Sequence, residues 1–176
     1  MSDLKLIFID IDGVLNNMVD ETSYFTYDPH KYGLSDANIG ILKHILAETG
    51  AKLVLSTSWR NHDDDFAYPW RDLRFKSPLR KFMQEMGNDA FFEIKSAPHL
   101  DGATKAQDII GFFYILKDQF GLDMSEVRFA VIDDQTNQDL QRFTHNFFLT
   151  DKEVGLTWND AVSIIHHLTK EFNNCN

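Results

Sequence analysis

The chain of 176 residues contains a single cysteine, Cys175, one place before its C-terminus. A disulfide within the chain needs two cysteines and a cysteine-rich zinc site needs several, so both are excluded. This scarcity fits a reducing compartment. The opening MSDLKLIFID lacks a basic segment followed by a long apolar one, and no run approaches the roughly 18 apolar residues of a membrane span. We therefore expect a cytoplasmic protein with no membrane contact.

Basic residues are also in the minority. The chain has 17 Lys and Arg against 27 Asp and Glu, which gives a formal net charge of −10. A protein this acidic has no overall attraction for nucleic acids or anionic membranes, although acidic clusters attract divalent cations. In one stretch, 70–81 (WRDLRFKSPLRK), basic and aromatic residues alternate. That pattern is typical of an amphipathic helix with long side chains on its solvent-exposed face, and also of surfaces that hold single-stranded nucleic acids.

Short apolar runs alternate with segments of helical periodicity, and no linker, repeat or low-complexity tract interrupts them. Continuous apolar runs are typical of parallel strands that helices cover on both faces. We predict strands at 4–9, 52–55, 91–94, 127–132 and 147–149, and helices at 36–49, 77–87, 103–120, 136–143 and 158–172. Residues 1–176 should therefore form one α/β domain, a three-layer α/β/α doubly wound parallel sheet.

Carboxylates follow two of the predicted strands. Asp10 and Asp12 come directly after the first strand, and Asp133 and Asp134 after the fourth. The carboxyl ends of parallel strands share one edge of the sheet, where open α/β folds bind their ligands. We therefore expect these acids to converge. Asp10 would act as a nucleophile and Asp12 as a general acid and base, with Mg²⁺ between them and a later aspartate.

Hydroxyl and cationic side chains are expected at the same edge. The second predicted strand runs into Ser56, Thr57 and Ser58. Two lysines compete for the position of the cation, and we favour Lys105 over Lys95 because Lys105 begins the helix that leads to the fourth strand. Carboxylates, hydroxyls and an ammonium group should therefore share one rim of the sheet.

At these residues the chain resembles the haloacid dehalogenase (HAD) superfamily of phosphohydrolases. The first motif of that family, an apolar strand followed by Asp-x-Asp-Gly, matches residues 10–13, and Val14 is also usual there. A strand ending in Ser or Thr, a Lys at a helix start and a strand ending in paired acids follow in the family's order. The resemblance implies a Rossmann-like HAD core. The intervals at 17–34 and about 60–100 are too short for a large cap domain, so small lids are expected there.

The resemblance also implies a role for each acid. Asp10 would attack phosphorus and form an aspartyl-phosphate. Asp12 would protonate the leaving oxygen and then activate water. Mg²⁺ would be held by the carboxylate of Asp10, the backbone carbonyl of Asp12 and Asp133, with Asp134 as a further ligand or a neighbour of the ligands. Lys105 would neutralise the phosphate and the nucleophile.

The other matched residues would contact the substrate. Thr57 occupies the family's hydroxyl position, Ser56 is the alternative, and Ser58 offers a further hydroxyl. Arg60, just beyond them, is a candidate contact for a substrate phosphate. Gly13 would permit the turn that brings the acid and base over the site.

An aspartate at position 12 favours a phosphatase, because family members without it lack that proton donor. The segments LSTSWR (55–60), Lys105 to Ile109 and IDD (132–134) also resemble a small HAD branch associated with RNA-end repair. We expect a phosphorylated substrate, either a small molecule or a nucleic-acid end. The alternatives are a receiver-like signalling module that binds Mg²⁺ and keeps a phosphoaspartate, and an interaction domain on the same fold.

Overall fold

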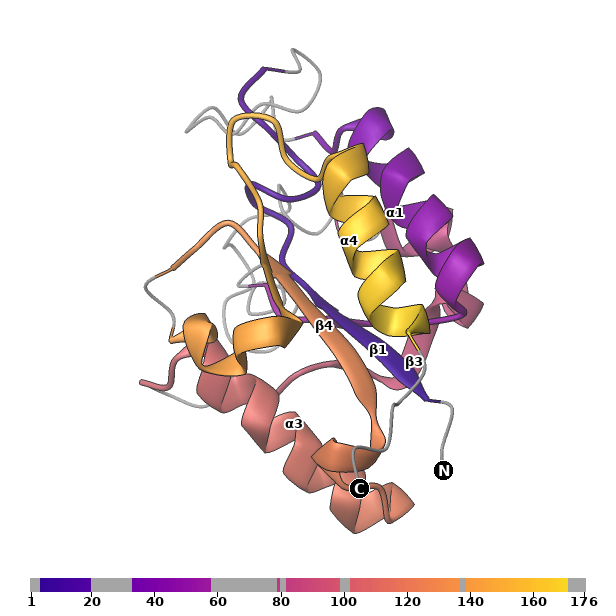
Figure 1. Ribbon diagram of the computed structural model, residues 1–176, viewed down its shortest axis with the longest axis vertical. Helices are drawn as coiled ribbons and strands as arrows, with labels where there is room; N and C mark the ends of the chain where they lie inside the picture. The colour runs from indigo at the N-terminus through magenta and orange to yellow at the C-terminus, as the bar shows by residue number, and fades with distance from the viewer. Residues whose placement is uncertain are drawn as a thin grey trace, which may run out of the picture.

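The computed structural model describes residues 4–19, 33–57, 79, 82–98, 102–136 and 139–170. Within them, five strands form one parallel sheet in the order β3-β2-β1-β4-β5 (Figure 1). The strands are β1 (Lys5–Ile9), β2 (Lys52–Leu55), β3 (Phe91–Ser96), β4 (Arg128–Asp133) and β5 (Phe147–Leu149). The α-helices are α1 (Asp36–Thr49), α3 (Lys105–Phe120) and α4 (Trp158–Thr169), and residues 82–86 are helical too. Short 3₁₀ segments are η2 (Asn88–Ala90), η3 (Met124–Glu126) and η4 (Leu140–Asn146).

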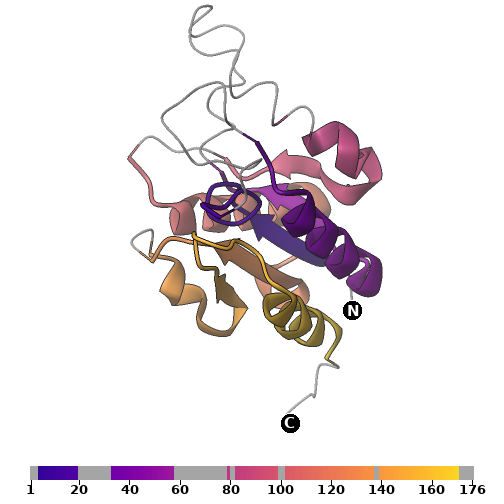
Figure 2. The same cartoon turned by 90° about the horizontal axis from the view of Figure 1, so that it is seen from above.

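β1 is the central strand of the sheet. It pairs with β2 on one side and with β4 on the other, and Ile9 lies opposite both Leu55 and Ile132. α1 and α4 lie side by side on one face of the sheet (Figure 2), and α3 covers the other (Figure 1). The predicted three-layer, doubly wound α/β fold is therefore confirmed, and the described residues include no large cap domain.

Alternate residues of β1 are buried in two different cores. Ile7 and Ile9 join the cluster beneath α1 and α4, whereas Leu6 and Phe8 join the cluster beneath α3. The ring of Phe8 meets that of Phe112 edge-on, with 5.2 Å between their centroids. A strand that packs on both faces cannot shift its register without exposing apolar side chains, so the position of its carboxyl end is fixed.

Three of the predicted helices begin at side-chain caps. The hydroxyl of Ser35 accepts the N–H of Asn38 at the start of α1, and α1 ends at Gly50, which is left-handed with φ 67°. Thr157 and Asp160 form a reciprocal capping box at the start of α4. α3 is capped by Thr104 and therefore begins at residue 105 rather than at 103, which makes Lys105 its first residue.

The helix predicted at 136–143 is wrong. Instead, η4 begins four residues later, after Asp139 in a left-handed conformation (φ 59°), and it is interrupted at Thr144 (φ 45°, ψ −98°). Neither conformation belongs to an α-helix, so the 3.6-residue pattern cannot continue through them. The last helix ends at residue 169 rather than 172, because Lys170 turns to ψ 129°.

None of the helices that the structure describes combines the length and the apolar character needed to cross a bilayer.

Candidate active site

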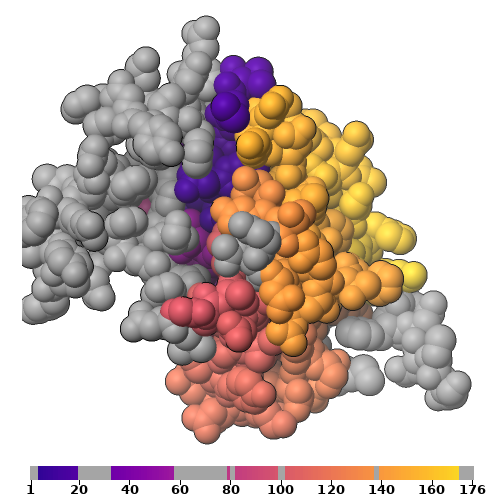
Figure 3. Space-filling model, turned by 90° about the vertical axis from the view of Figure 1, so that its left-hand side faces the viewer, coloured from indigo at the N-terminus to yellow at the C-terminus, as the bar shows by residue number. Residues whose placement is uncertain are grey.

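The pairing of β1 with β4 brings acidic residues together at the carboxyl edge of the sheet. Asp10 directly follows β1, and its N–H donates to the carbonyl of Ile132 at 3.0 Å, so it lies beside Asp133, the last residue of β4. One carboxylate oxygen from each of Asp10, Asp133 and Asp134 lies within 4.8 Å of the others. Figure 3 shows the face where these segments meet: the indigo surface after β1, the orange surface after β4 and the pink start of α3.

Lys105 joins the two buried acids from the first turn of α3. Its ammonium group donates to Oδ2 of Asp10 and, at 2.7 Å, to Oδ2 of Asp133. The other oxygen of each acid accepts a backbone N–H: Ile11 donates to Asp10 at 2.7 Å and Gln135 to Asp133 at 2.9 Å. Both carboxylates are thus held at two points, which fixes their orientation before any ligand arrives.

The cluster has more negative than positive charge. Burial raises the pKa of Asp133 to about 7, and the charge of Asp10 adds to the rise. The pKa of Asp134 is raised as well, by burial first and by Asp10 second. Burial lowers the pKa of Lys105, but the carboxylates of Asp10 and Asp133 outweigh it, so that pKa is raised on balance. Among the described residues, the ammonium group of Lys105 contacts two of the three carboxylates, and a divalent cation would balance the remaining negative charge.

The donor set fits a hard divalent cation. Oδ1 of Asp134 is buried and has no hydrogen-bond partner among the residues that the structure describes. A buried carboxylate oxygen without a partner is costly, and a cation beside it would remove that cost. The candidate ligands on Asp10, Asp133 and Asp134 are all oxygens, which Mg²⁺ and Ca²⁺ prefer. These three residues could therefore hold a metal ion.

The metal-free protein is expected to become less stable as the pH rises from about 4 to about 7. Asp133 has a pKa of about 7 in the folded protein against an ordinary value of 3.8, so over this window the folded state keeps a proton that the unfolded chain has lost. Deprotonation therefore favours unfolding. In EDTA, the urea midpoint of the wild type should fall with pH relative to that of Asp133→Asn, in which this group cannot ionise. Parallel pH profiles for the two proteins would contradict this expectation.

The turn after β1 carries Asp12 and Gly13 toward the cluster. Gly13 has φ +68°, and a Cβ atom placed on it would lie 2.5 Å from Cγ of Asp134. Glycine is needed there both for the left-handed backbone and for the close approach of that carboxylate. The side chain of Asp12 is half-buried and accepts a hydrogen bond from Nδ2 of Asn16 at 2.8 Å.

Thr150 is a further residue of the site that the sequence did not reveal. Its hydroxyl donates to the carbonyl of Gly13 at 2.9 Å, and its N–H donates to the carbonyl of Asp133 at 3.0 Å. It therefore ties the turn after β1 to the end of β4. The signal was available, because Thr150 directly follows the fifth predicted strand and so reaches the same edge of the sheet.

The predicted hydroxyl residues follow β2 at this edge. Ser56 and Thr57 are both buried, and Oγ of Ser56 has no hydrogen-bond partner among the described residues. An unpartnered buried hydroxyl at this edge of the sheet could bind a ligand, so Ser56 stays a candidate together with Thr57. Ser58 and Arg60 lie outside the described residues, and their predicted contacts with substrate stay predictions.

The two competing lysines occupy different places. Lys95 lies on β3 and donates to Oδ1 of Asn88 at 2.9 Å. Lys105 instead lies between Asp10 and Asp133, as described above. The geometry thus brings Lys105 and not Lys95 to the acids, in the place that the sequence favoured.

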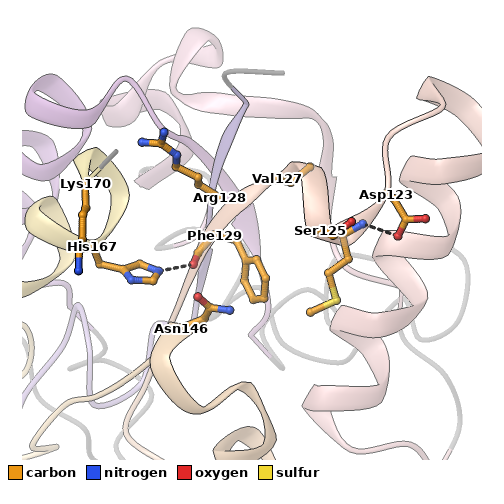
Figure 4. Close-up of a pocket in the computed structure, with 9 residues that line it drawn as sticks. Asp123, Ser125, Val127, Arg128, Phe129, Asn146, His167 and Lys170 are labelled. Atoms are coloured by element: carbon orange, nitrogen blue, oxygen red, sulfur yellow. Dashed lines mark hydrogen bonds between the residues drawn. The ribbon is translucent and has the colours of Figure 1, made fainter. Parts of the chain in front are cut away.

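A cavity of about 620 Å³ lies elsewhere, at the start of β4 (Figure 4). Phe129 lines it near the beginning of the strand whose other end carries Asp133. Polar groups on its wall bind α4 to β4: Nε2 of His167 donates to the carbonyl of Phe129 at 3.0 Å, and Arg128 donates to the carbonyl of Leu168 at 3.2 Å. This cavity is separated from the acidic cluster by the length of the strand.

Comparison with known proteins agrees with this geometry. Residues 6–161 match the family described as the HAD domain in Swiss Army Knife RNA repair proteins. No curated protein matches the chain. The matched span contains all the acids of the cluster together with Lys105, and it supports a hydrolase. Both resemblances that the sequence predicted, to the HAD superfamily and to its RNA-repair branch, are confirmed. The chain belongs to the family of HAD domains found in Swiss Army Knife RNA repair proteins.

Proposed function

We propose that this protein is a Mg²⁺-dependent phosphomonoester hydrolase that works through an aspartyl-phosphate on Asp10. The observation that carries the proposal is the contact of Lys105 with both Asp10 and Asp133 in a cluster of three carboxylates. A carboxylate can approach an anionic phosphate only where positive charge offsets the repulsion. The lysine provides one such charge next to the nucleophile, and the acids would hold another.

The residues divide the reaction into two steps. In the first, an oxygen of Asp10 bonds to phosphorus while the bond from phosphorus to the leaving oxygen breaks, and Asp12 gives that oxygen a proton. In the second, Asp12 takes a proton from water as the water oxygen attacks phosphorus, which releases phosphate and restores Asp10. Lys105 stays within reach of Asp10 and stabilises the charge that gathers on the transferring group.

The side chains of Asp10, Asp133 and Asp134, with the backbone carbonyl of Asp12, are the residues that would hold the metal. When bound, Mg²⁺ supplies positive charge that neutralises the phosphoryl oxygens. Buried oxygen donors and an unpartnered oxygen on Asp134 support this assignment.

We propose a terminal phosphate of RNA as the substrate. The family is described from RNA repair proteins, and the described residues contain no large cap that would close the site over a small metabolite. Without a large cap, this edge of the sheet would admit a polymer end as well as a small ester. The basic and aromatic residues of the stretch 70–81, together with Arg60, would supply contacts to the RNA backbone. Of these positions only the buried Leu79 belongs to the described residues.

A panel of phosphate esters tests the proposal. We expect phosphate release from RNA oligonucleotides with a 3′- or 5′-phosphate, dependent on Mg²⁺ and abolished by EDTA. Matched DNA oligonucleotides, mononucleotides and p-nitrophenyl phosphate serve as comparisons. Preference for nucleotides or sugar phosphates over every RNA end would contradict the proposal of an RNA substrate. Absence of turnover of every ester with Mg²⁺ present would contradict the proposed hydrolase activity.

A further inference from the structure

Asn16 is a fully buried amide in the turn after β1. Its Nδ2 donates to Oδ1 of Asp12 at 2.8 Å, and its Oδ1 accepts the N–H of Gly13 at 2.8 Å. A carboxylate oxygen accepts and a backbone N–H donates, so the two partners together decide which end of the amide faces which group. The amide therefore has a single orientation that satisfies both contacts.

The backbone that carries Asn16 is itself held in place. The N–H groups of Val14 and Leu15 donate to the carbonyl of Ile11 at 3.2 and 2.9 Å, which closes the turn. The N–H of Leu156, in the loop before α4, donates to the carbonyl of Val14 at 2.9 Å and ties the turn to the rest of the fold. A buried amide on an anchored turn can impose a direction on a half-buried carboxylate, whereas a mobile one could not.

We propose that Asn16 is a positioning residue that aims the carboxylate of Asp12 at the leaving oxygen. This inference rests on the proposed function, since it assigns the control of the acid and base in that reaction. The hydrogen bond on Oδ1 fixes the rotation of the carboxylate about its Cβ–Cγ bond, and thereby the direction from which Asp12 delivers its proton. A residue that only closed the turn would need the contact with Gly13 and not the contact with Asp12.

Two substitutions separate these roles. Asn16→Ala removes both hydrogen bonds. Asn16→Asp has the same shape and still accepts the N–H of Gly13, but it places an oxygen where Asp12 requires a donor. The readout is kcat/KM for p-nitrophenyl phosphate and for phenyl phosphate, because it reports the step in which the leaving group departs. Phenolate is the poorer leaving group and depends more on protonation by Asp12.

Both variants are expected to lose about 10- to 100-fold in kcat/KM on phenyl phosphate and only a few-fold on p-nitrophenyl phosphate. The ratio between the substrates does not depend on how much of a variant is folded, because both rates scale with the same active fraction. Equal losses on the two substrates, or an Asn16→Asp protein that behaves as wild type, would overturn the inference. Wild-type protein inactive on both substrates and on every phosphorylated oligonucleotide would overturn the proposed function, and this inference with it.

Asn17 provides the matched control. It is the next residue, it is also buried, and its Nδ2 donates to Oδ1 of Asn38 at 2.8 Å. Asn17→Asp makes the same chemical change beside the same turn and removes a buried donor from Asn38 instead of from Asp12. We expect a lower thermal midpoint with an unchanged ratio between the two substrates. A ratio altered as strongly as in Asn16→Asp would show that the turn responds to any buried charge, and would overturn the role given to Asn16.

Discussion

Replacing Asp10 with Asn is expected to reduce phosphatase turnover by at least about 10⁴-fold, the scale seen when a nucleophile is removed. The amide has nearly the same shape but cannot form the bond to phosphorus. We expect the fold to survive. One hydrogen bond is lost, because Ile11 and Lys105 both donate to this side chain. Repulsion toward Asp133 is relieved at the same time, so the thermal midpoint should move by no more than about 4 °C.

Phosphate release and thermal unfolding, measured on the same preparations, test this expectation. Asp139→Asn is the matched control, since Asp139 is exposed, pairs with Arg142 and is not one of the residues of the cluster. Full turnover by the Asp10→Asn protein would refute the aspartyl-phosphate mechanism. The alternative, a signalling module, would differ from a hydrolase in the lifetime of phosphorylated Asp10. A phosphoaspartate that persists for minutes in the wild type favours the signalling module, whereas rapid loss of the phosphate favours the hydrolase.

Lys105→Met is expected to affect both stability and activity. Methionine keeps the apolar part of the side chain but removes the charge that Asp10 and Asp133 share. Breaking a buried ion pair by removing one partner costs about 3–5 kcal/mol, because the remaining charge stays buried without compensation. For a protein of this size that corresponds to a fall of roughly 10 °C in the thermal midpoint. Turnover should fall by about 10³-fold or more, since the phosphate loses its nearest cation.

Lys117→Met is the control for this variant. Lys117 is on the same helix and pairs with Asp123 at 2.7 Å, but both side chains are largely exposed. Solvent screens such a pair, so we expect its removal to leave the thermal midpoint almost unchanged. Mg²⁺ should raise the midpoint of Lys105→Met more than that of the wild type, because the metal would replace the missing positive charge. Equal midpoints for the two lysine variants in EDTA would contradict the role of Lys105.

The elements of this fold were largely predictable because their signals are local. Continuous apolar runs indicated buried strands, and Ser35, Gly50 and the Thr157–Asp160 capping box marked helix ends that the structure contains. The prediction of a helix at 136–143 was wrong because of the local backbone conformation. The left-handed backbone at residue 139 is not visible in an apolar periodicity, which records only the spacing of side chains.

The acidic edge was predictable for a topological reason. In a parallel sheet every strand ends on the same side, so Asp10 and Asp133 had to meet once their strands were placed as neighbours. The same rule, applied to the fifth strand, would have added Thr150. Its contact with Gly13 joins residues 137 positions apart, and no spacing in the sequence announces such a pair.

The sequence by itself determined which acids, hydroxyls and lysines follow each predicted strand. Only the tertiary structure decided which of them touch. In the folded protein Lys105 donates hydrogen bonds to Asp10 and Asp133, whereas Lys95 donates to Asn88. The tertiary structure also enclosed Asn16 beneath the first turn, against Asp12. Hydrogen bonds act over about 3 Å and pKa shifts depend on burial, and both are properties of the packed molecule rather than of residue order.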